Sequence, residues 1–238
     1  MSTPEGPGFS AEVCQILRTQ AAPYNEWPSV IRRRKIVVSA VLLIGAVLLG
    51  YSLNREPGDE SFLWLTLALA AVWTVGAFAS GPLHLGHVRF RDRNQRPVIT
   101  GTVVGLALGA VFLVGGLLAR EVPGVREYIT RVLEHSNTGP LLLIVFIVVI
   151  NGVAEELFFR GALYTALERY HPAIVSTVLY VVATTASTGN PMLGFAAAVL
   201  GTVCALERRA TGGVLAPVLT HFFWGLVLVL ALPTIFGV

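Results

Sequence analysis

Three ionisable residues lie close together in an apolar stretch of the chain and could do acid–base chemistry. Glu155, Glu156 and Arg160 are the charges that fall within the predicted membrane-spanning segments, where an ionisable group costs about 2.5–3.5 kcal/mol to insert. Glu156 and Arg160 are four residues apart, which places them on one helix face and predicts an ion pair. Glu155 points about 100° away around the helix and has no partner there. A buried, unpaired carboxylate is suited to accept a proton, so we expect Glu155 to be a general base.

Two further side chains are candidates for the same site. Asn151 lies one turn before Glu155 and could orient its carboxylate or a water molecule held by it. His221 is the one histidine that falls inside a predicted span. If the three charges only held helices together, neither an unpaired carboxylate nor a membrane histidine would be needed, so the pattern favours a site.

Metal and cofactor chemistry is not indicated. The chain has no HExxH pattern, and a single histidine in the membrane is too few ligands for zinc. Cys14 and Cys204 are far apart and form no CxxC pair, which argues against both a disulfide framework and a structural zinc site. We therefore expect no metal and no cofactor.

The composition places the elements that carry these residues in a lipid bilayer. Hydrophobic residues make up 54% of the 238 residues and charged residues 13%, against roughly a quarter charged in ordinary soluble domains. The mean hydropathy is +0.71. The net charge of +3 is small and lies in the loops, which argues against a nucleic-acid partner. An integral, multi-pass membrane protein is predicted.

Apolar runs of about 20 residues are long enough to cross a bilayer as helices. The stretch 173–206 is too long for one helix and is divided at Gly189-Asn190-Pro191, a turn signal. We expect an all-α, polytopic membrane protein with about seven transmembrane helices. The predicted spans are 36–53, 62–80, 98–118, 140–164, 173–189, 191–206 and 214–236.

The basic residues of the loops predict the orientation. Twelve of the seventeen Lys and Arg residues lie on one side, including the run Arg32–Lys35 and four arginines in the loop 81–97. Because loops rich in Lys and Arg remain on the cytoplasmic side of the membrane, the N-terminus is predicted to be cytoplasmic and the C-terminus external. The membrane is the plasma membrane if the source is bacterial. The chain divides into a polar, partly disordered cytoplasmic tail (1–35), N-terminal membrane helices with loops (36–139) and a core that holds the site (140–236).

Two patterns concern helix packing. Gly101, Gly105 and Gly109 form a small-residue stripe, which favours close approach of another helix of the same chain. Residues 120–135 have apolar residues at helical spacing and are predicted to form a helix on the outer surface.

The sequence around the charges resembles a known family. The run Glu155-Glu156-Leu157-Phe158-Phe159-Arg160 resembles the EExxxR motif of the CPBP family, which covers CAAX prenyl endopeptidases of the second type and the bacteriocin-processing or immunity proteins called Abi. The likeness continues through Leu193-Gly194-Phe195, the stretch Arg209–Pro217 and Thr220-His221, and covers roughly residues 140–230. It implies a CPBP-like helical bundle that cleaves a membrane-associated protein or peptide with activated water.

The resemblance also implies roles for the candidate residues. Glu155 would be the base that activates water, and His221 would stabilise the oxyanion. Glu156 and Arg160 would support the site structurally.

Two positions depart from the family pattern. Thr184, in the run that begins at Tyr180, stands where the second motif has a histidine; a threonine can hold a water but cannot take its proton. Gly225 stands where the third motif has Asn or Asp. Because losing one oxyanion donor costs on the order of 10²–10³ in rate, two alternatives to an endopeptidase stay open. One is a catalytically impaired relative that acts as a membrane-binding or self-immunity protein, and the other is a small transporter or channel.

Overall fold

A computed structural model of the chain describes residues 20–56, 58–90, 93–134 and 139–238. Within these ranges, six helical segments are long and apolar enough to cross a membrane, and α8 (Pro172–Thr188) is a shorter apolar helix of 17 residues. The predictions of an all-α fold and of a polytopic, multi-pass membrane protein are confirmed. The six long segments are α2 (Pro28–Leu53), α3 (Glu60–Ser80), α4 (Val98–Ala119), the run Leu141–Ala166, α9 (Pro191–Thr211) and α10 (Leu215–Phe236).

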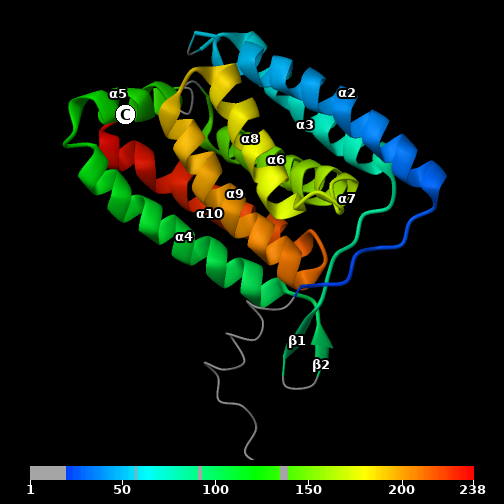
Figure 1. The fold of residues 1–238 in the computed structure, drawn as a ribbon. Helices are drawn as coiled ribbons and strands as arrows, with labels where there is room; N and C mark the ends of the chain where they lie inside the picture. Colours follow the sequence, from blue (N-terminus) through cyan, green and yellow to red (C-terminus); the bar gives the residue numbers. More distant parts are fainter. Residues whose placement is uncertain (1–19, 57, 91–92, 135–138) are drawn as a thin grey trace, which may run out of the picture.

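The run Leu141–Ala166 lies at the centre of the bundle and consists of α6 (Leu141–Glu156), the π-helix η2 (Leu157–Leu163) and α7 (Tyr164–Ala166). Helices α2 and α3 pack together on one side of it, and α4 and α10 pack together on the other (Figure 1). Helices α8 and α9 form a third pair, and α6 contacts both α3 and α10. Side chains that leave α6 and η2 in different directions therefore meet different helices.

The ends of the helices follow local sequence signals. The side chain of Asn190 accepts hydrogen bonds from the backbone N–H groups of Met192 and Leu193, which caps α9. Gly212 has φ +72° and ends α9 in the left-handed conformation. Helix α9 thus continues five residues beyond the predicted span and includes Glu207 and Arg208. Helix α2 begins at Pro28, eight residues before the predicted start, and includes Arg34.

The glycine stripe of α4 packs against α10, as predicted. A Cβ atom on Gly101 or on Gly105 would lie 2.6 Å from a backbone carbonyl of α10, that of Ala216 or Thr220 respectively. A Cβ on Gly109 would lie 2.9 Å from the side chain of Val227. Only a residue without a Cβ allows this approach, so the stripe holds two helices of one chain together.

Of the regular structure in the connections, the helix at residues 123–134 was predicted from the sequence and the hairpin in the loop 81–97 was not. The loop 81–97 forms a short antiparallel hairpin of β1 (Val88–Phe90) and β2 (Arg93–Gln95). The predicted surface helix is α5 (Pro123–Glu134), at the opposite end of the bundle (Figure 1). Of the predicted tail 1–35, residues 1–19 lie outside the described residues, and residues 20–27 follow an extended path to α2.

The segment 20–27 is held against the end of the bundle by several contacts. The Tyr24 hydroxyl donates to the carbonyl oxygen of Gly212 at 2.9 Å, and its ring stacks on His84 with 3.4 Å between ring centroids. The backbone N–H of Ala21 donates to the carbonyl of Arg209 at 2.9 Å. This segment therefore covers the α9–α10 turn.

Candidate active site

The π-helix η2 shapes the backbone at the site. Its wider turn interrupts the regular i to i−4 hydrogen bonds, and the Arg160 carbonyl accepts a hydrogen bond from a side chain, Arg208 Nε, at 2.9 Å. Arg208 also donates to Thr165 Oγ1 at 3.3 Å, and its guanidinium carbon lies 4.8 Å from the centroid of the Tyr164 ring. Helix α9 thus braces η2 through one buried arginine.

Glu156 and Arg160 form the predicted ion pair. Arg160 Nη1 lies 3.0 Å from Glu156 Oε1, and both side chains are completely buried. Gly201 of α9 makes room for the guanidinium, because a Cβ at this position would lie 2.8 Å from Arg160 Nη2. The pair ties the end of α6 to η2 and leaves each partner dependent on the other's charge.

His221 of α10 contacts the same carboxylate. Its Nδ1 lies 3.0 Å from Glu156 Oε1, and the contact joins residues 65 positions apart in the chain. Because a carboxylate only accepts, Nδ1 carries a proton and Nε2 is left for other chemistry. Gly152, one turn before Glu156, makes room for the ring, since a Cβ there would lie 2.9 Å from His221 Cδ2. Glu156 therefore sets the orientation and the tautomer of His221, a role beyond the predicted structural support.

Glu155 is half-buried and has a partner on another helix. The Tyr180 hydroxyl of α8 donates a hydrogen bond of 2.7 Å to Glu155 Oε2. The prediction that Glu155 has no partner in its own helix agrees with this arrangement, but the conclusion that it is unpaired was wrong. The error arose because helical spacing predicts contacts only between residues of one helix. It does not predict a contact with Tyr180, which lies 25 residues further along the chain on another helix. Glu155 and His221 come close enough to interact electrostatically.

Two predicted site residues do not join this group. The Asn151 amide donates to the carbonyl of Ile147 in its own helix at 2.9 Å, so it does not orient Glu155. Thr184 contributes its backbone carbonyl to a hydrogen bond from Thr188, and no described hydrogen bond joins its hydroxyl to Glu155. Helix α8 points Tyr180 at Glu155, whereas Thr184 lies one turn further along.

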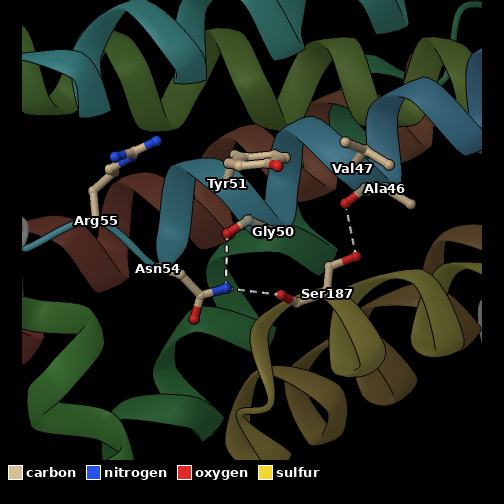
Figure 2. A pocket seen from close by; sticks show the side chains of 7 residues that line it. All are labelled: Ala46, Val47, Gly50, Tyr51, Asn54, Arg55 and Ser187. Atoms are coloured by element: carbon tan, nitrogen blue, oxygen red, sulfur yellow. Dashed lines mark hydrogen bonds between the residues drawn. The ribbon is translucent and has the colours of Figure 1, made fainter.

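Ser187, which follows Thr184 in α8, contacts α2 and not the site around Glu155. Figure 2 shows Ser187 in a pocket between α2 and α8, where its hydroxyl donates to the Ala46 carbonyl at 2.8 Å. In the same pocket, the Asn54 amide donates to the carbonyls of Gly50 and Ser187 (Figure 2). These contacts join α2 to α8 and add no group to the site around Glu155.

Sequence reasoning missed a second buried acid. Glu207 of α9 is 8% exposed, and its Oε1 lies 2.9 Å from Thr220 Oγ1, which also lies 3.1 Å from the Gly101 carbonyl. Thr220 directly precedes His221, so Glu207 contacts α10 beside the site. The predicted span ended at residue 206 because Glu207 begins a charged run, although the glycine pair 212–213 marks the actual helix end. Glu207, Arg208 and Arg34 are thus buried charges within helices, although Glu207 and Arg208 were expected in a loop and Arg34 in the tail.

The described residues contain no group of three or more His, Cys, Asp or Glu side chains that could hold a metal ion. Cys204 is buried and unbridged within the same ranges, and Cys14 lies outside them. The site contains the half-buried carboxylate of Glu155, the Tyr180 hydroxyl that donates a hydrogen bond to it, and His221. The histidine is oriented by the carboxylate of Glu156. These groups suit the activation of water and the stabilisation of developing charge.

The match with a protein family covers the helices that carry these groups. Residues 137–227 match the family model described as type II CAAX prenyl endopeptidase Rce1-like. This stretch, the Rce1-like domain, is similar to that family. It contains Glu155, Glu156, Arg160, Tyr180, Glu207 and His221, and it confirms the resemblance to CAAX prenyl endopeptidases of the CPBP family. No match was found among curated proteins or among solved structures.

The matched stretch covers less than half of the chain, and its likeness is to proteins described as type II CAAX prenyl endopeptidases. Helices α2, α3 and α4 lie outside the matched residues, although α4 packs on α10 and α3 packs on α6. The division of the chain into a tail, N-terminal helices and a core from 140 to 236 stays a prediction.

Proposed function

We propose that this chain is an intramembrane endopeptidase in which Glu155 activates water to cleave a membrane-associated protein or peptide. The observation that carries the proposal is the position of Glu155 in the Rce1-like domain. Its carboxylate is half-buried and accepts a hydrogen bond from Tyr180, and it lies close enough to interact electrostatically with His221, whose Nδ1 contacts Glu156.

The two adjacent glutamates have different tasks in this mechanism. Glu155 accepts a proton from a water molecule as the hydroxide attacks the peptide carbonyl, and it returns that proton to the leaving amine when the C–N bond breaks. Glu156 holds Nδ1 of His221, so that Nε2 faces away from the ion pair, and Nε2 donates to the developing oxyanion when the ring carries a proton on both nitrogens. Arg160 compensates the charge of Glu156 in the bundle interior.

The test is cleavage by the purified chain in lipid nanodiscs, with a broad library of membrane-anchored peptides that includes prenylated C-terminal ones. Glu155→Gln should abolish cleavage and retain the fold, because glutamine keeps the size of the side chain and cannot accept the proton. Glu207→Gln is the matched control, since it changes a buried carboxyl of the same domain outside the proposed chemistry. If no peptide is cleaved in a Glu155-dependent manner, the proposal is wrong.

A second function is favoured by one observation at the third motif. Gly225 has no side chain to contribute, and a Cβ there would lie 3.2 Å from Val148 Cγ1, so apolar packing replaces a polar group. A non-catalytic relative that binds a membrane partner would keep Glu156, Arg160 and His221 as a polar core. Such a protein would retain its cellular phenotype in the Glu155→Gln variant, whereas an endopeptidase would lose it.

A further inference from the structure

Tyr180 lies between the two charged parts of the site. Its hydroxyl donates to Glu155 Oε2 at 2.7 Å, and its ring centroid lies 4.8 Å from the guanidinium carbon of Arg160. The ring is 7% exposed and packs against Phe159 with 4.7 Å between centroids. One side chain of α8 thus contacts both the candidate base and the cation that balances Glu156.

These contacts keep Glu155 out of an ion pair. Arg160 directs Nη1 at Glu156, and the Tyr180 ring lies near its guanidinium. Glu155 lies five residues before Arg160 and accepts a hydrogen bond from the Tyr180 hydroxyl instead. A carboxylate in a direct arginine pair is a poor proton acceptor, whereas one held by a neutral hydroxyl loses less of its basicity.

We propose that Tyr180 is a positioning residue that holds the Glu155 carboxylate through Oε2 and leaves Oε1 to the attacking water. This inference rests on the proposed function of Glu155. A phenol has one proton to donate, so Tyr180 holds a single carboxylate oxygen, and a hydrogen bond to a charged group is stronger than one between neutral groups.

Neither Asn151 nor Thr184 is placed to position the Glu155 carboxylate. Asn151 is bonded to Ile147, and no described hydrogen bond joins the Thr184 hydroxyl to Glu155. Among the described residues, the titratable and charged groups that interact with Glu155 include Tyr180 on α8, His221 on α10, and Glu156 and Arg160 in its own helical run. Of these, Tyr180 is the one with a hydrogen bond to Glu155.

The test reads the state of Glu155 without a substrate. An apolar carbodiimide reacts with a carboxyl group only in its protonated form, and tandem mass spectrometry separates labelled Glu155 from its neighbour Glu156. Tyr180→Phe deletes the hydroxyl and keeps the ring over Arg160. Between about pH 5 and pH 8, the pH at which labelling of Glu155 falls to half should rise by about one unit, because a hydrogen bond to the ionised form is lost.

Tyr164→Phe is the matched control. Tyr164 is also buried, and its ring lies at the same 4.8 Å from an arginine, Arg208. This control should leave the labelling profile of Glu155 unchanged. A second variant places 3-fluorotyrosine at position 180, whose more acidic hydroxyl donates more strongly and should move the profile the opposite way.

An unchanged labelling profile in Tyr180→Phe would overturn the inference, whatever the protein cleaves. A shifted profile together with a fall in kcat at unchanged KM supports it. A shifted profile in a protein that cleaves nothing would support the contact and refute the proposed function, so the two failures are distinguishable.

Discussion

His221 and Glu156 are joined by a 3.0 Å contact between Nδ1 and Oε1 at a point where α6 and α10 cross. The same oxygen accepts from Arg160 Nη1 at 3.0 Å, and the other carboxylate oxygen is buried without a partner among the described residues. Glu156 therefore neutralises a buried cation and orients a histidine with a single atom. Its neighbour Glu155 instead accepts a hydrogen bond from Tyr180.

Removing Glu156 should unfold the protein far more readily than removing Glu155. Glu156→Ala leaves Arg160 as an uncompensated charge in the bundle, which costs about 3–5 kcal/mol. Glu155→Ala removes a half-buried carboxylate bonded to a neutral hydroxyl and should cost about 1–2 kcal/mol. Reversible unfolding in mixed detergent micelles measures both free energies. Equal losses in the two variants would contradict this division of roles.

Gly152→Ala should displace His221 while every polar group of the site remains. The added methyl group would lie 2.9 Å from His221 Cδ2, so the ring must move, at a cost of about 1–3 kcal/mol. Misplacing a catalytic group by about 1 Å can reduce a rate about 100-fold, and we expect a loss of that order in Glu155-dependent cleavage. Gly115→Ala on α4 is the control, since its Cβ would meet nothing within 4 Å. Full activity in Gly152→Ala would show that the ring position does not matter.

Arg208→Met should destabilise η2. The variant leaves the Arg160 carbonyl without its hydrogen bond and costs about 1–3 kcal/mol of unfolding free energy. Arg169→Met, at an exposed position, should change it by less than about 0.5 kcal/mol. Amide hydrogen exchange across residues 157–163 should rise in the first variant alone. Unchanged exchange there would mean that Arg208 does not brace the π-helix.

His84 predicts a pH dependence at the end of the bundle where the segment 20–27 is bound. Burial, followed by the charge of Arg208, lowers the pKa of His84, with Arg34 acting in the same direction and Glu26 against it. The unfolded chain then takes up the proton first, so stability is complete above the ordinary histidine pKa and falls as the pH drops below it. We expect a decrease of about 1–2 °C in Tm on acidification from above to below about pH 6.5.

His84→Phe provides the comparison for this effect. It keeps an aromatic ring against Tyr24 and removes the titration, so this part of the pH dependence should disappear. Differential scanning calorimetry of both proteins over the same pH range measures it. An identical pH dependence in the variant would assign the effect to another group.

The predicted orientation can be tested by cysteine labelling. In a background with Cys14→Ser and Cys204→Ala, a cysteine in place of Gln95 in the hairpin should react with an impermeant maleimide only after the cells are opened. A cysteine in place of Arg126 in α5 should react in intact cells, because the basic side of the bundle is expected to face the cytoplasm. Labelling of Gln95→Cys from outside would reverse the topology.

The sequence by itself determined the fold class of the protein and indicated the location of its candidate site. Uninterrupted apolar runs located the helices, because in a bilayer the backbone must bond within its own segment. The spacing of Glu156 and Arg160 determined their ion pair, since helical geometry fixes neighbours four residues apart. The glycines of α4 likewise indicated close packing against a helix of the same chain.

Only the tertiary structure decided which partners the site residues take. Whether Tyr180 or Thr184 meets Glu155 depends on the rotation of α8 against α6, and whether His221 meets Glu155 or Glu156 depends on the packing of α10. The π-helix and its bond from Arg208 depend on α9, which extends past the charged run that seemed to end it. Contacts between helices are set by the packing of whole surfaces, and a pattern read along a single helix does not contain them.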